Sequence, residues 1–537
     1  MAIAARQNFN VQATRLPAST ISHSLLSSAA VEKRVVSAAG KWAGSLNRTA
    51  VVDRALNEND SWLNRGQLLP TLSTVQYSPN AEVGEVAHRV WHPDMKLTLL
   101  DGRQTTLGEL VPFAMPMWHF LTGGTDMFSG VPTISRPWDN MLDPYARSMV
   151  AMRALLEFNG KMGIPYYCAH NGDLIDLTQT NLRDIQEQHD LMVQGVMKPL
   201  QEQTGVGLGW YTNQFFVAPL FSEGAFTGPH TDAYLLASWL AKSALDTVVD
   251  LGGRGFVWWG GREGFKDARI TDMPLQGRLA SQFFRNAVNY GEKIGFFQEG
   301  RKFWIEPKRK EPSGEQADAD VRTSWSNIQE AGLQDHIGFN IEVNHAWLAG
   351  REARDEFMKA VALGRLYGID ANRGTNKFTG WDSDLFPGWQ EGLEIGEALV
   401  HAGGTVKVVN FDAKLQREDR WEEYPRIVAR GMDNVARGAY LTTKSGVPAL
   451  QTTRWSEWRQ PLGLELLSEG RTLESDALLA ETHFKQGIPS GKQNGMQHLV
   501  DETESAGVFK DADAAIAARF AAQTSAGVNE PMESTGV

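Results

Sequence analysis

The segment FNIEVNHAWLAG (339–350) places an acid and an imidazole at the end of an expected strand. Its first five residues, FNIEV, carry apolar side chains at every second position, which is typical of a β-strand. Glu342 lies inside this pattern and His345 follows three residues later. One such pair is weak evidence for a site, because a single Glu or His is more often a satisfied structural residue. The segment therefore gains meaning only if other strands end in the same way.

Seven further short runs rich in Val, Ile, Phe, Tyr and Trp recur between longer amphipathic stretches. Residues 143–163 and 351–366 show the three- and four-residue apolar spacing of helices. Strands that alternate with helices predict a parallel sheet with right-handed crossovers. The eight expected strands are residues 111–118, 163–169, 206–212, 255–259, 302–306, 337–343, 365–370 and 405–412.

The residues at the carboxyl ends of these strands separate a closed barrel from an open doubly wound sheet, which shows the same alternation. A barrel brings all eight ends onto one rim, whereas an open sheet spreads them along an edge. Residue types suited to chemistry or binding stand at every end, so the predicted fold is an α/β (β/α)8 TIM barrel. In chain order the ends are Trp118, His170, Thr212, Trp259, Glu306, Glu342, Asp370 and Asp412.

The last four strand ends carry carboxylates, and the segment GWDSDLF (380–386) adds two acids that are two residues apart. So many like charges in a partly desolvated pocket repel one another, so the cluster requires a cation. Oxygen ligands with one imidazole and no thiolate favour Mg²⁺, Mn²⁺ or Co²⁺ over structural zinc. Because the ligands exceed what one octahedral ion needs, we expect two divalent metal ions, bridged by Glu342. The candidate ligands are Glu306, Glu342, His345, Asp370, Asp382, Asp384 and Asp412.

Several motifs of the chain resemble those of D-xylose isomerase, the two-metal aldose–ketose isomerase, and of its longer-chain class in particular. They lie in order between about residues 70 and 502: YYCAHNGDL, VWWGGREGF, IEPKRKEP, FNIEVNHAWLAG, GIDANRG, GWDSDLFPG, VNFDAK and SGKQ. The resemblance implies conversion of D-xylose to D-xylulose, and of D-glucose to D-fructose as a side activity. The implied route is metal-assisted ring opening followed by a 1,2-hydride shift. The resemblance also implies a C-terminal arm that embraces a neighbouring subunit, in a homotetramer or homodimer.

The same resemblance divides the candidate ligands between two ions that share Glu342. The first ion, which grips two substrate hydroxyl oxygens, would take in addition Glu306, Asp370 and Asp412. The second, which shifts during the reaction, would take His345, Asp382 and Asp384.

The resemblance also assigns catalytic and substrate-binding roles. Lys308 would hydrogen-bond the carbonyl oxygen O1 of the sugar, and His170, oriented by Asp173, would assist ring opening. Without the resemblance, Lys308 is equally well a structural counter-ion, and the two tryptophans of the pocket are as consistent with plain core packing. The implied pocket residues are Trp118, Phe128, Thr212 and Trp259, with Phe128 completing a neighbour's site.

Three positions depart from the family's usual pattern. Ala169 and Asn171 flank His170 where the family usually has Phe and Asp, and Arg309 follows Lys308 where it usually has Pro. Asn171 removes one negative charge beside the ring-opening histidine, and Arg309 adds a positive charge beside Lys308. We expect an active isomerase, in which these changes affect sugar preference more than reaction type.

Composition argues against other classes of partner. The net charge of −12 gives a surface that repels nucleic acid and anionic membranes, so neither is expected as a partner. No stretch approaches the 18 apolar residues of a membrane span. Cys168, the only cysteine, excludes an intrachain disulfide and a thiolate zinc site, and we expect it to pack as a small hydrophobe.

The chain is expected to comprise a polar N-terminal extension (1–70), the catalytic barrel with a short preamble (71–414), an arm for subunit contacts (415–502) and a flexible tail (503–537). Residues 1–31 contain no Asp or Glu and many Ser and Ala, which is typical of organellar presequences and of disordered extensions alike. The predicted location is cytoplasmic, or organellar if this segment is a presequence.

Two alternative functions remain open from the residues. The departures at Asn171 and Arg309 are compatible with a protein that binds sugar and metal with little turnover. A metal-dependent phosphodiester hydrolase on the same fold would need more histidine ligands and a basic face along which nucleic acid could lie. Ketose formation from an aldose distinguishes both from an isomerase.

Overall fold

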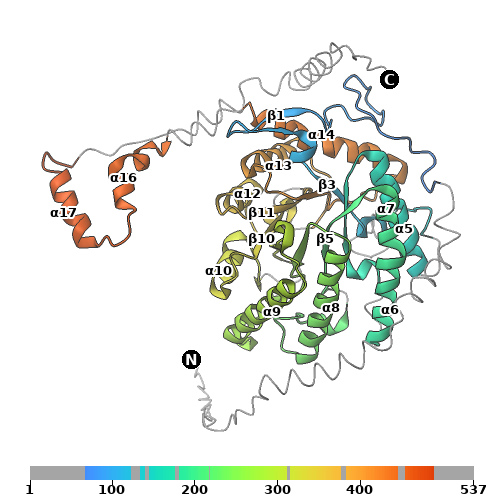
Figure 1. Ribbon diagram of the computed structural model, residues 1–537, viewed down its shortest axis with the longest axis horizontal. Helices are drawn as coiled ribbons and strands as arrows, with labels where there is room; N and C mark the ends of the chain where they lie inside the picture. Colours follow the sequence, from blue (N-terminus) through green and yellow to red (C-terminus); the bar gives the residue numbers. More distant parts are fainter. Residues whose placement is uncertain are drawn as a thin grey trace, which may run out of the picture.

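Eight parallel strands form a closed barrel in the computed structural model, which describes residues 67–121, 134–139, 144–175, 181–216, 218–310, 315–375, 382–444 and 454–488. Each strand pairs with the next in chain order, β12 pairs with β3, and so the sheet has no edge. The sequence-predicted barrel is therefore confirmed (Figure 1). The strands are β3 (Phe113–Pro116), β4 (Tyr166–His170), β5 (Gly207–Thr212), β6 (Gly255–Trp259), β8 (Phe303–Glu306), β10 (Ile337–Glu342), β11 (Leu366–Asp370) and β12 (Val408–Asn410).

Long helices surround the barrel and connect its strands (Figure 1). Several begin and end at residues suited to those positions: the side chain of Asp320 accepts a hydrogen bond from Thr323 N at the start of α10, and Gly332 ends that helix with φ of 71°. The long helices are α5 (Pro144–Met162), α6 (Leu182–Met192) with the π-helix η2 (Val193–Met197) and α7 (Lys198–Thr204), α8 (Thr231–Asp250), α9 (Met273–Lys293), α10 (Val321–Ala331), α12 (Ala353–Ala362), α13 (Trp389–Ala402) and α14 (Tyr424–Thr442).

The remaining elements are shorter. Two small antiparallel pairs are β1 (Lys96–Thr98) with β2 (Gln104–Thr106), and β7 (Gly264–Phe265) with β9 (Glu315–Gln316). The short helices are α3 (Leu107–Leu110), α4 (Trp118–Leu121), η1 (Asn171–Asp173), η3 (Pro219–Phe221), η4 (Ala268–Ile270), η5 (Gln298–Gly300), α11 (Val343–Leu348), η6 (Trp421–Glu423), η7 (Ser456–Arg459), α16 (Pro461–Leu466) and α17 (Leu473–His483).

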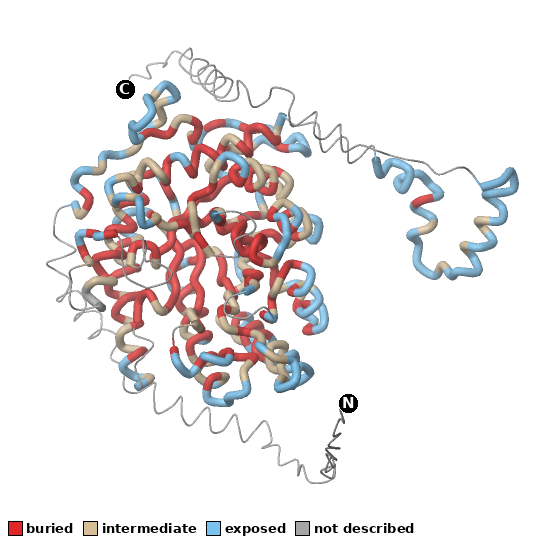
Figure 2. Tube along the Cα trace, turned by 180° about the vertical axis from the view of Figure 1, so that it is seen from behind, coloured by how far each residue is buried: buried red, intermediate tan, exposed pale blue. Residues whose placement is uncertain are grey.

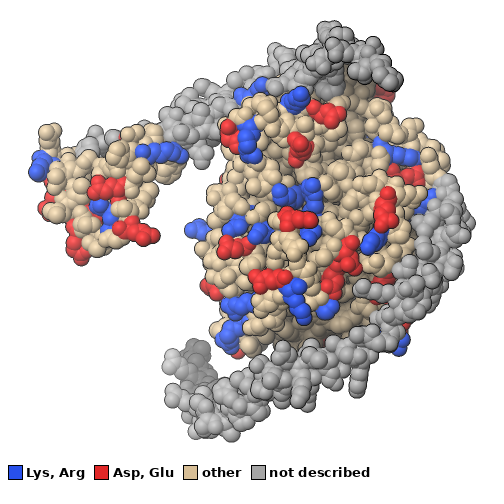
Figure 3. Space-filling model, viewed as in Figure 1, with Lys and Arg blue, Asp and Glu red and all other residues tan. Residues whose placement is uncertain are grey.

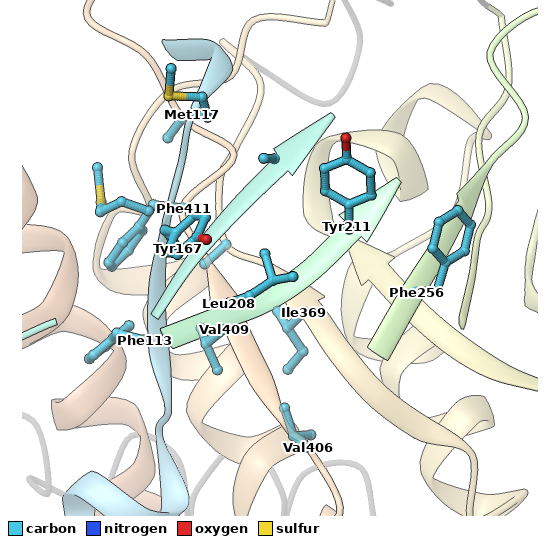
Figure 4. Close-up of a cluster of buried hydrophobic side chains, with 14 of the residues drawn as sticks. Phe113, Met117, Tyr167, Leu208, Tyr211, Phe256, Ile369, Val406, Val409 and Phe411 are labelled. Atoms are coloured by element: carbon cyan, nitrogen blue, oxygen red, sulfur yellow. The ribbon is translucent and has the colours of Figure 1, made fainter. Parts of the chain in front are cut away.

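The two faces of the sheet bury two separate apolar clusters. The outer face packs against the helices, and Figure 4 shows part of this cluster, including Phe113, Tyr167 and Phe256. The inner face forms a second cluster inside the barrel, to which Cys168 belongs, so this thiol packs as a small hydrophobe as expected. The inner cluster consists of Ala114, Cys168, Trp210, Val257, Trp304 and Val408.

Because side chains alternate along a strand, those that point into the barrel continue at every second residue to its carboxyl rim. Trp304 lies in the inner cluster, so Glu306, two residues later, has the same orientation. Parallel pairing then brings neighbouring ends together, with Glu306 beside Trp259 and Glu342 beside Asp370. Alternation within each strand thus places the predicted strand-end residues around one opening.

The helical coat extends beyond residue 414, where the sequence placed the start of the arm. Helix α14 is largely buried and packs along α13, and its Asp433 accepts hydrogen bonds from the backbone N–H groups of Arg89, Val90 and Trp91 at 2.8–2.9 Å. This helix therefore belongs to the layer of helices around the barrel rather than to an arm.

Residues 454–488 lie apart from the barrel in both views, and Figure 2 shows them almost entirely exposed. They carry large apolar side chains on their surface, among them Trp455 (51% exposed), Leu467 (69%) and Leu473 (85%). The described residues of this segment therefore form no apolar core of their own.

Within the described residues, no helix is both long and apolar enough to cross a membrane. The expected extension, apart from residues 67–70, and the tail lie outside the described part of the chain, as does the candidate presequence. Their roles and the cellular location stay predictions.

Candidate metal and sugar site

The structure brings all seven candidate metal ligands to one rim of the barrel. Four sets of three residues each offer ligand atoms that lie within 4.8 Å of one another. Glu342 belongs to three of these sets, which is the position a bridging carboxylate would need. The sets are Glu306, Glu342 and His345; Glu342, Asp370 and Asp412; Glu342, Asp382 and Asp384; and His119, Asp384 and Asp412.

Burial makes this concentration of acids costly. Desolvation raises the pKa of Glu342 well above its usual range, and the charges of Asp412 and Asp382 raise it further. Burial likewise raises the pKa of Asp370, with added repulsion from Glu306. Burial also raises the pKa of Glu306 and Asp384, although the latter has a lysine partner. The cluster thus holds more negative charge than its surroundings compensate.

Two buried atoms at the centre of the cluster are placed to bind a cation. Glu342 Oε2 and His345 Nδ1 face each other at 3.1 Å, yet neither has a hydrogen-bond partner among the described residues. Buried polar atoms are nearly always satisfied, so these two atoms are suited to bind a ligand. Carboxylate oxygens with one imidazole form the donor set that Mg²⁺, Mn²⁺ or Co²⁺ accepts, and the residues present therefore fit such ions.

Asp412 is the exception among the acids. Burial raises its pKa, but the hydrogen bond and charge of His119 outweigh that effect, and the net shift is downward. His119 Nε2 lies 2.6 Å from Asp412 Oδ1 and Trp118 Nε1 donates to the same oxygen at 3.0 Å. Trp118, expected only as a wall, therefore also holds a candidate ligand, and His119 is a candidate site residue that was not predicted from the sequence.

Lys308 lies inside the acid cluster rather than at its border. Its ammonium group donates to Asp382 Oδ2 at 2.6 Å and to His345 Nε2 at 2.8 Å. It also lies 5.3 Å from the ring centroid of Trp259, a cation–π contact. Lys308 thus contacts two candidate ligands of the second ion and one wall of the pocket.

A second lysine accompanies the acids and was not anticipated. Lys414 Nζ donates to Asp384 Oδ2 at 2.8 Å, and this attraction raises the pKa of Lys414 above its usual value. It lies two residues after Asp412 in the motif VNFDAK, so its spacing from a strand-end acid was a usable signal.

His170 stands among aromatic rings on the opposite side of the rim. Its ring centroid lies 4.2 Å from that of Trp118 and 6.1 Å from that of Trp259. Asp173 Oδ2 accepts from the backbone N–H of His170 at 2.8 Å and lies 3.4 Å from its Nδ1. The pair expected for ring opening is therefore adjacent, within a pocket wall that is largely aromatic.

Asn171, where the family usually has an acid, turns away from the acid cluster. Its Oδ1 accepts from Gln214 N at 2.7 Å, while its buried Nδ2 has no partner among the described residues. The side chain thus ties the loop after β4 to the loop after β5. The hydroxyl of Thr212 donates to Val257 O at 2.6 Å, which binds β5 to β6 beside the pocket.

The remaining predicted residues lie at the margin or outside the described chain. The guanidinium group of Arg309 lies 3.7 Å from the carboxylate of Glu315 on the surface, whereas Lys308 bonds Asp382 in the acid cluster. Glu263, in the loop after β6, accepts from the backbone N–H groups of Ala225 and Thr227 at 2.7 and 2.9 Å. Phe128 lies outside the described residues, so its role stays a prediction.

Figure 3 shows Lys and Arg interspersed with Asp and Glu over the visible face of the barrel. On this face the charges are not separated by sign, unlike in the buried rim.

Comparison with known proteins identifies relatives along most of the chain. A xylose isomerase of Thermotoga maritima is 34% identical over 445 residues, which cover 81% of this chain and 97% of that protein. A xylose isomerase of Burkholderia vietnamiensis is 36% identical over 409 residues, covering 74% of this chain and 91% of that protein. No protein-family model matches the chain.

Solved structures resemble the chain less closely. A xylose isomerase domain protein of Alicyclobacillus acidocaldarius is 12% identical with a TM-score of 0.41, covering 62% of this chain and 99% of that one. An L-ribulose 3-epimerase is 12% identical with a TM-score of 0.38, covering 67% and 99%. Neither value supports an argument about function.

Proposed function

The chain belongs to the xylose isomerase family, and from that premise we propose that it converts D-xylose to D-xylulose, with D-glucose to D-fructose as a side activity. The observation that carries the proposal is the convergence of Glu306, Glu342, Asp370 and Asp412 with His345 at one rim. An acid cluster of this density is stable and useful only with cations among its oxygens.

Two divalent ions would supply electrostatic stabilisation of the charge that develops on the sugar oxygens O1 and O2. In the proposal, Glu306, Asp370 and Asp412 hold one ion, His345, Asp382 and Asp384 hold the other, and Glu342 belongs to both. The orphaned Oε2 of Glu342 supports this sharing.

The chain's own residues would bind and orient the sugar. Lys308, an ammonium donor within the cluster, would hydrogen-bond O1 of the open-chain sugar. His170 would move a proton between the ring oxygen and O1 during ring opening, with Asp173 beside its Nδ1 favouring one tautomer. Trp118 and Trp259 would exclude water and pack against the CH faces of the sugar.

The direct test is ketose formation from D-xylose by the full chain with Mg²⁺, Mn²⁺ or Co²⁺. We expect activity with at least one ion, loss of activity with a chelator, and a loss of about 10³-fold or more in Glu342→Gln. The matched control is Asp433→Asn, which alters a buried acid on α14 that holds only backbone N–H groups, and it should keep its activity. Binding of sugar and metal without ketose formation would contradict the proposal.

We also propose that residues 454–488 pack on a second copy of the chain in a homodimer or homotetramer. The exposed apolar side chains of this segment support the proposal, because a segment of this composition gains stability by burying them. Light scattering coupled to gel filtration should give the mass of two or four chains. A monomer would contradict the proposal, and truncation after residue 444 should weaken the assembly.

A further inference from the structure

Four buried asparagines contact the candidate metal ligands from below and from the side. Asn340 Nδ2 donates to Glu306 Oε2 at 2.9 Å and to Asp370 Oδ2 at 2.6 Å. Asn410 Nδ2 donates to the other oxygen of Asp370 at 2.8 Å. Both asparagines are fully buried inside the barrel. Both oxygens of Asp370 are thus held in place by amide donors.

The other two asparagines hold the shared acid and one acid of the second set. Asn372 Nδ2 donates to Glu342 Oε1 and to the backbone oxygen of Asp412, each at 2.7 Å. Asn344 Nδ2 donates to Asp382 Oδ1 at 2.6 Å, and its backbone N–H donates to Asn372 Oδ1 at 3.1 Å. The amide hydrogen bonds therefore form two groups, one around Asp370 and one that joins Asn344 to Asn372.

These contacts join different strands. Asn340 lies two residues before Glu342 in β10, yet it bonds acids of β8 and β11. Asn372 lies two residues after Asp370, yet it bonds Glu342 of β10. Asn340 bonds two acid side chains and so fixes their separation, whereas Asn372 fixes Glu342 relative to the backbone at Asp412.

Two glycines leave room for these amides. A Cβ atom added to Gly368 would lie 2.3 Å from Asn340 Oδ1, and one added to Gly374 would lie 2.5 Å from Asn344 Oδ1. A Cβ atom essentially never makes contacts this short. Glycine at these two positions therefore leaves space for Asn340 beside Trp304 and for Asn344 beside Trp347.

An amide suits this location because it donates hydrogen bonds without adding charge. Carboxylate oxygens only accept, so the Nδ2 end of each amide must face them. A lysine there would compete with a cation, and an aspartate would add to the repulsion. Hydrogen-bonded neighbours of metal ligands commonly set ligand orientation and affinity.

We propose that the four asparagines are positioning residues divided between two ions: Asn340 and Asn410 orient acids of the first, Asn344 orients an acid of the second, and Asn372 holds the shared Glu342. The inference rests on the two-ion site of the proposed function. It adds which side chains set the affinity of each ion.

The test is a calorimetric titration of the metal-free full chain with Mn²⁺ alone. For Asn340→Leu, which keeps the branched shape of the side chain but removes the donor, we expect one of two Mn²⁺ affinities to fall about 10- to 100-fold and the other to stay unchanged. For Asn344→Leu the other affinity should fall. A general loss of structure would not give opposite patterns in the two variants.

Two further variants separate positioning from folding. Gly368→Ala keeps Asn340 but displaces its side chain, so it should weaken the same ion as Asn340→Leu. Asn159→Leu is the matched control: Asn159 is fully buried and donates to Tyr166 O at 2.7 Å, at the opposite end of β4 from the site. Its Mn²⁺ affinities should equal those of the unaltered chain, whatever its melting temperature.

Wild-type affinities in a folded Asn340→Leu chain would overturn the inference, as would equal losses at both ions in both leucine variants. If Asn340→Leu does not fold, Gly368→Ala and Asn344→Leu give the same decision. A wild-type chain that binds no Mn²⁺ would instead contradict the proposed function, and this result appears before any variant is compared.

Discussion

The rim of the barrel and the layer directly beneath it are built on the same inward-facing positions but contrast in chemistry. The lower layer is apolar, with Trp210, Val257 and Trp304 packed together inside the strands. Two residues further along β8, the same face presents Glu306, and β10 presents Glu342. The lower layer stabilises the fold, whereas the rim carries buried charge that destabilises it. The difference supports the proposal that the rim residues serve a ligand rather than folding.

The largest expected effect on stability belongs to the apolar layer. Trp304→Ala removes a side chain that is 1% exposed and should lower the free energy of unfolding by about 3–5 kcal/mol. The loss should be the same with chelator and with Mn²⁺, because the indole is not expected to contact an ion. Urea unfolding under both conditions checks this. A loss confined to the Mn²⁺-bound protein would break the contrast between the layers.

A substitution at the rim should change the free energy of unfolding in the opposite direction. Glu342→Gln keeps the oxygen that accepts from Asn372 and removes a buried charge, so the metal-free chain should become more stable by about 2–3 kcal/mol at pH 8. The same variant should lose its response to Mn²⁺. Chemical unfolding in chelator measures the gain, and a destabilised metal-free Glu342→Gln would show that the acid is structural.

A buried histidine in the helical coat gives the opposite pH dependence from the rim. Burial lowers the pKa of His189 to about 4, and its ring contacts Tyr211 OH at 3.1 Å. The unfolded chain binds this proton below about pH 6.5 and the folded chain does not, so stability falls as the pH drops. Between pH 7 and pH 5, His189 should lower the free energy of unfolding by about 2 kcal/mol.

The check on His189 is the difference between two unfolding curves. His189→Asn should be less stable at pH 7 but should lose about 2 kcal/mol less than the unaltered chain on acidification. Parallel pH dependence in the two proteins would show that other groups dominate the acid response.

A further prediction concerns the rim acids and the pH dependence of metal binding. The raised pKa values of Glu342 and Asp370 mean that the folded metal-free chain retains protons that the unfolded chain loses. Its stability should therefore fall as the pH rises from the ordinary carboxyl pKa towards the raised one, by up to about 1.4 kcal/mol per pH unit and proton. Mn²⁺ replaces these protons, so the stabilisation by Mn²⁺ should grow between pH 6 and 8. A stabilisation that shrinks over this range would contradict the assignment.

Much of the fold and of the acid cluster was predictable because both depend on short-range patterns. Apolar runs separated by helical spacing gave all eight strands, and acids at their ends pointed to one rim. The structure shortens some strands: β3 ends at Pro116 and Trp118 begins α4, while Asp412 lies two residues beyond β12. The acids at the strand ends still converge at one rim although these strands are shorter.

The site residues that were not predicted bond to residues on other strands. Asn340, Asn372 and Asn410 stand two residues from an acid, which was visible, but asparagine at a strand end also suits an ordinary turn. Their partners lie 30–40 positions away, and only closure of the barrel brings them together. His119 was overlooked because its partner Asp412 is 293 positions distant and joins it only where β12 meets β3.

The most direct test of the central claim is the anomalous scattering of Mn²⁺ in crystals of the full chain. The account predicts two peaks per chain, both within ligand distance of Glu342, one near Asp370 and the other near Asp382. The absence of any peak among these carboxylates, in crystals whose protein is folded as a barrel, would contradict it.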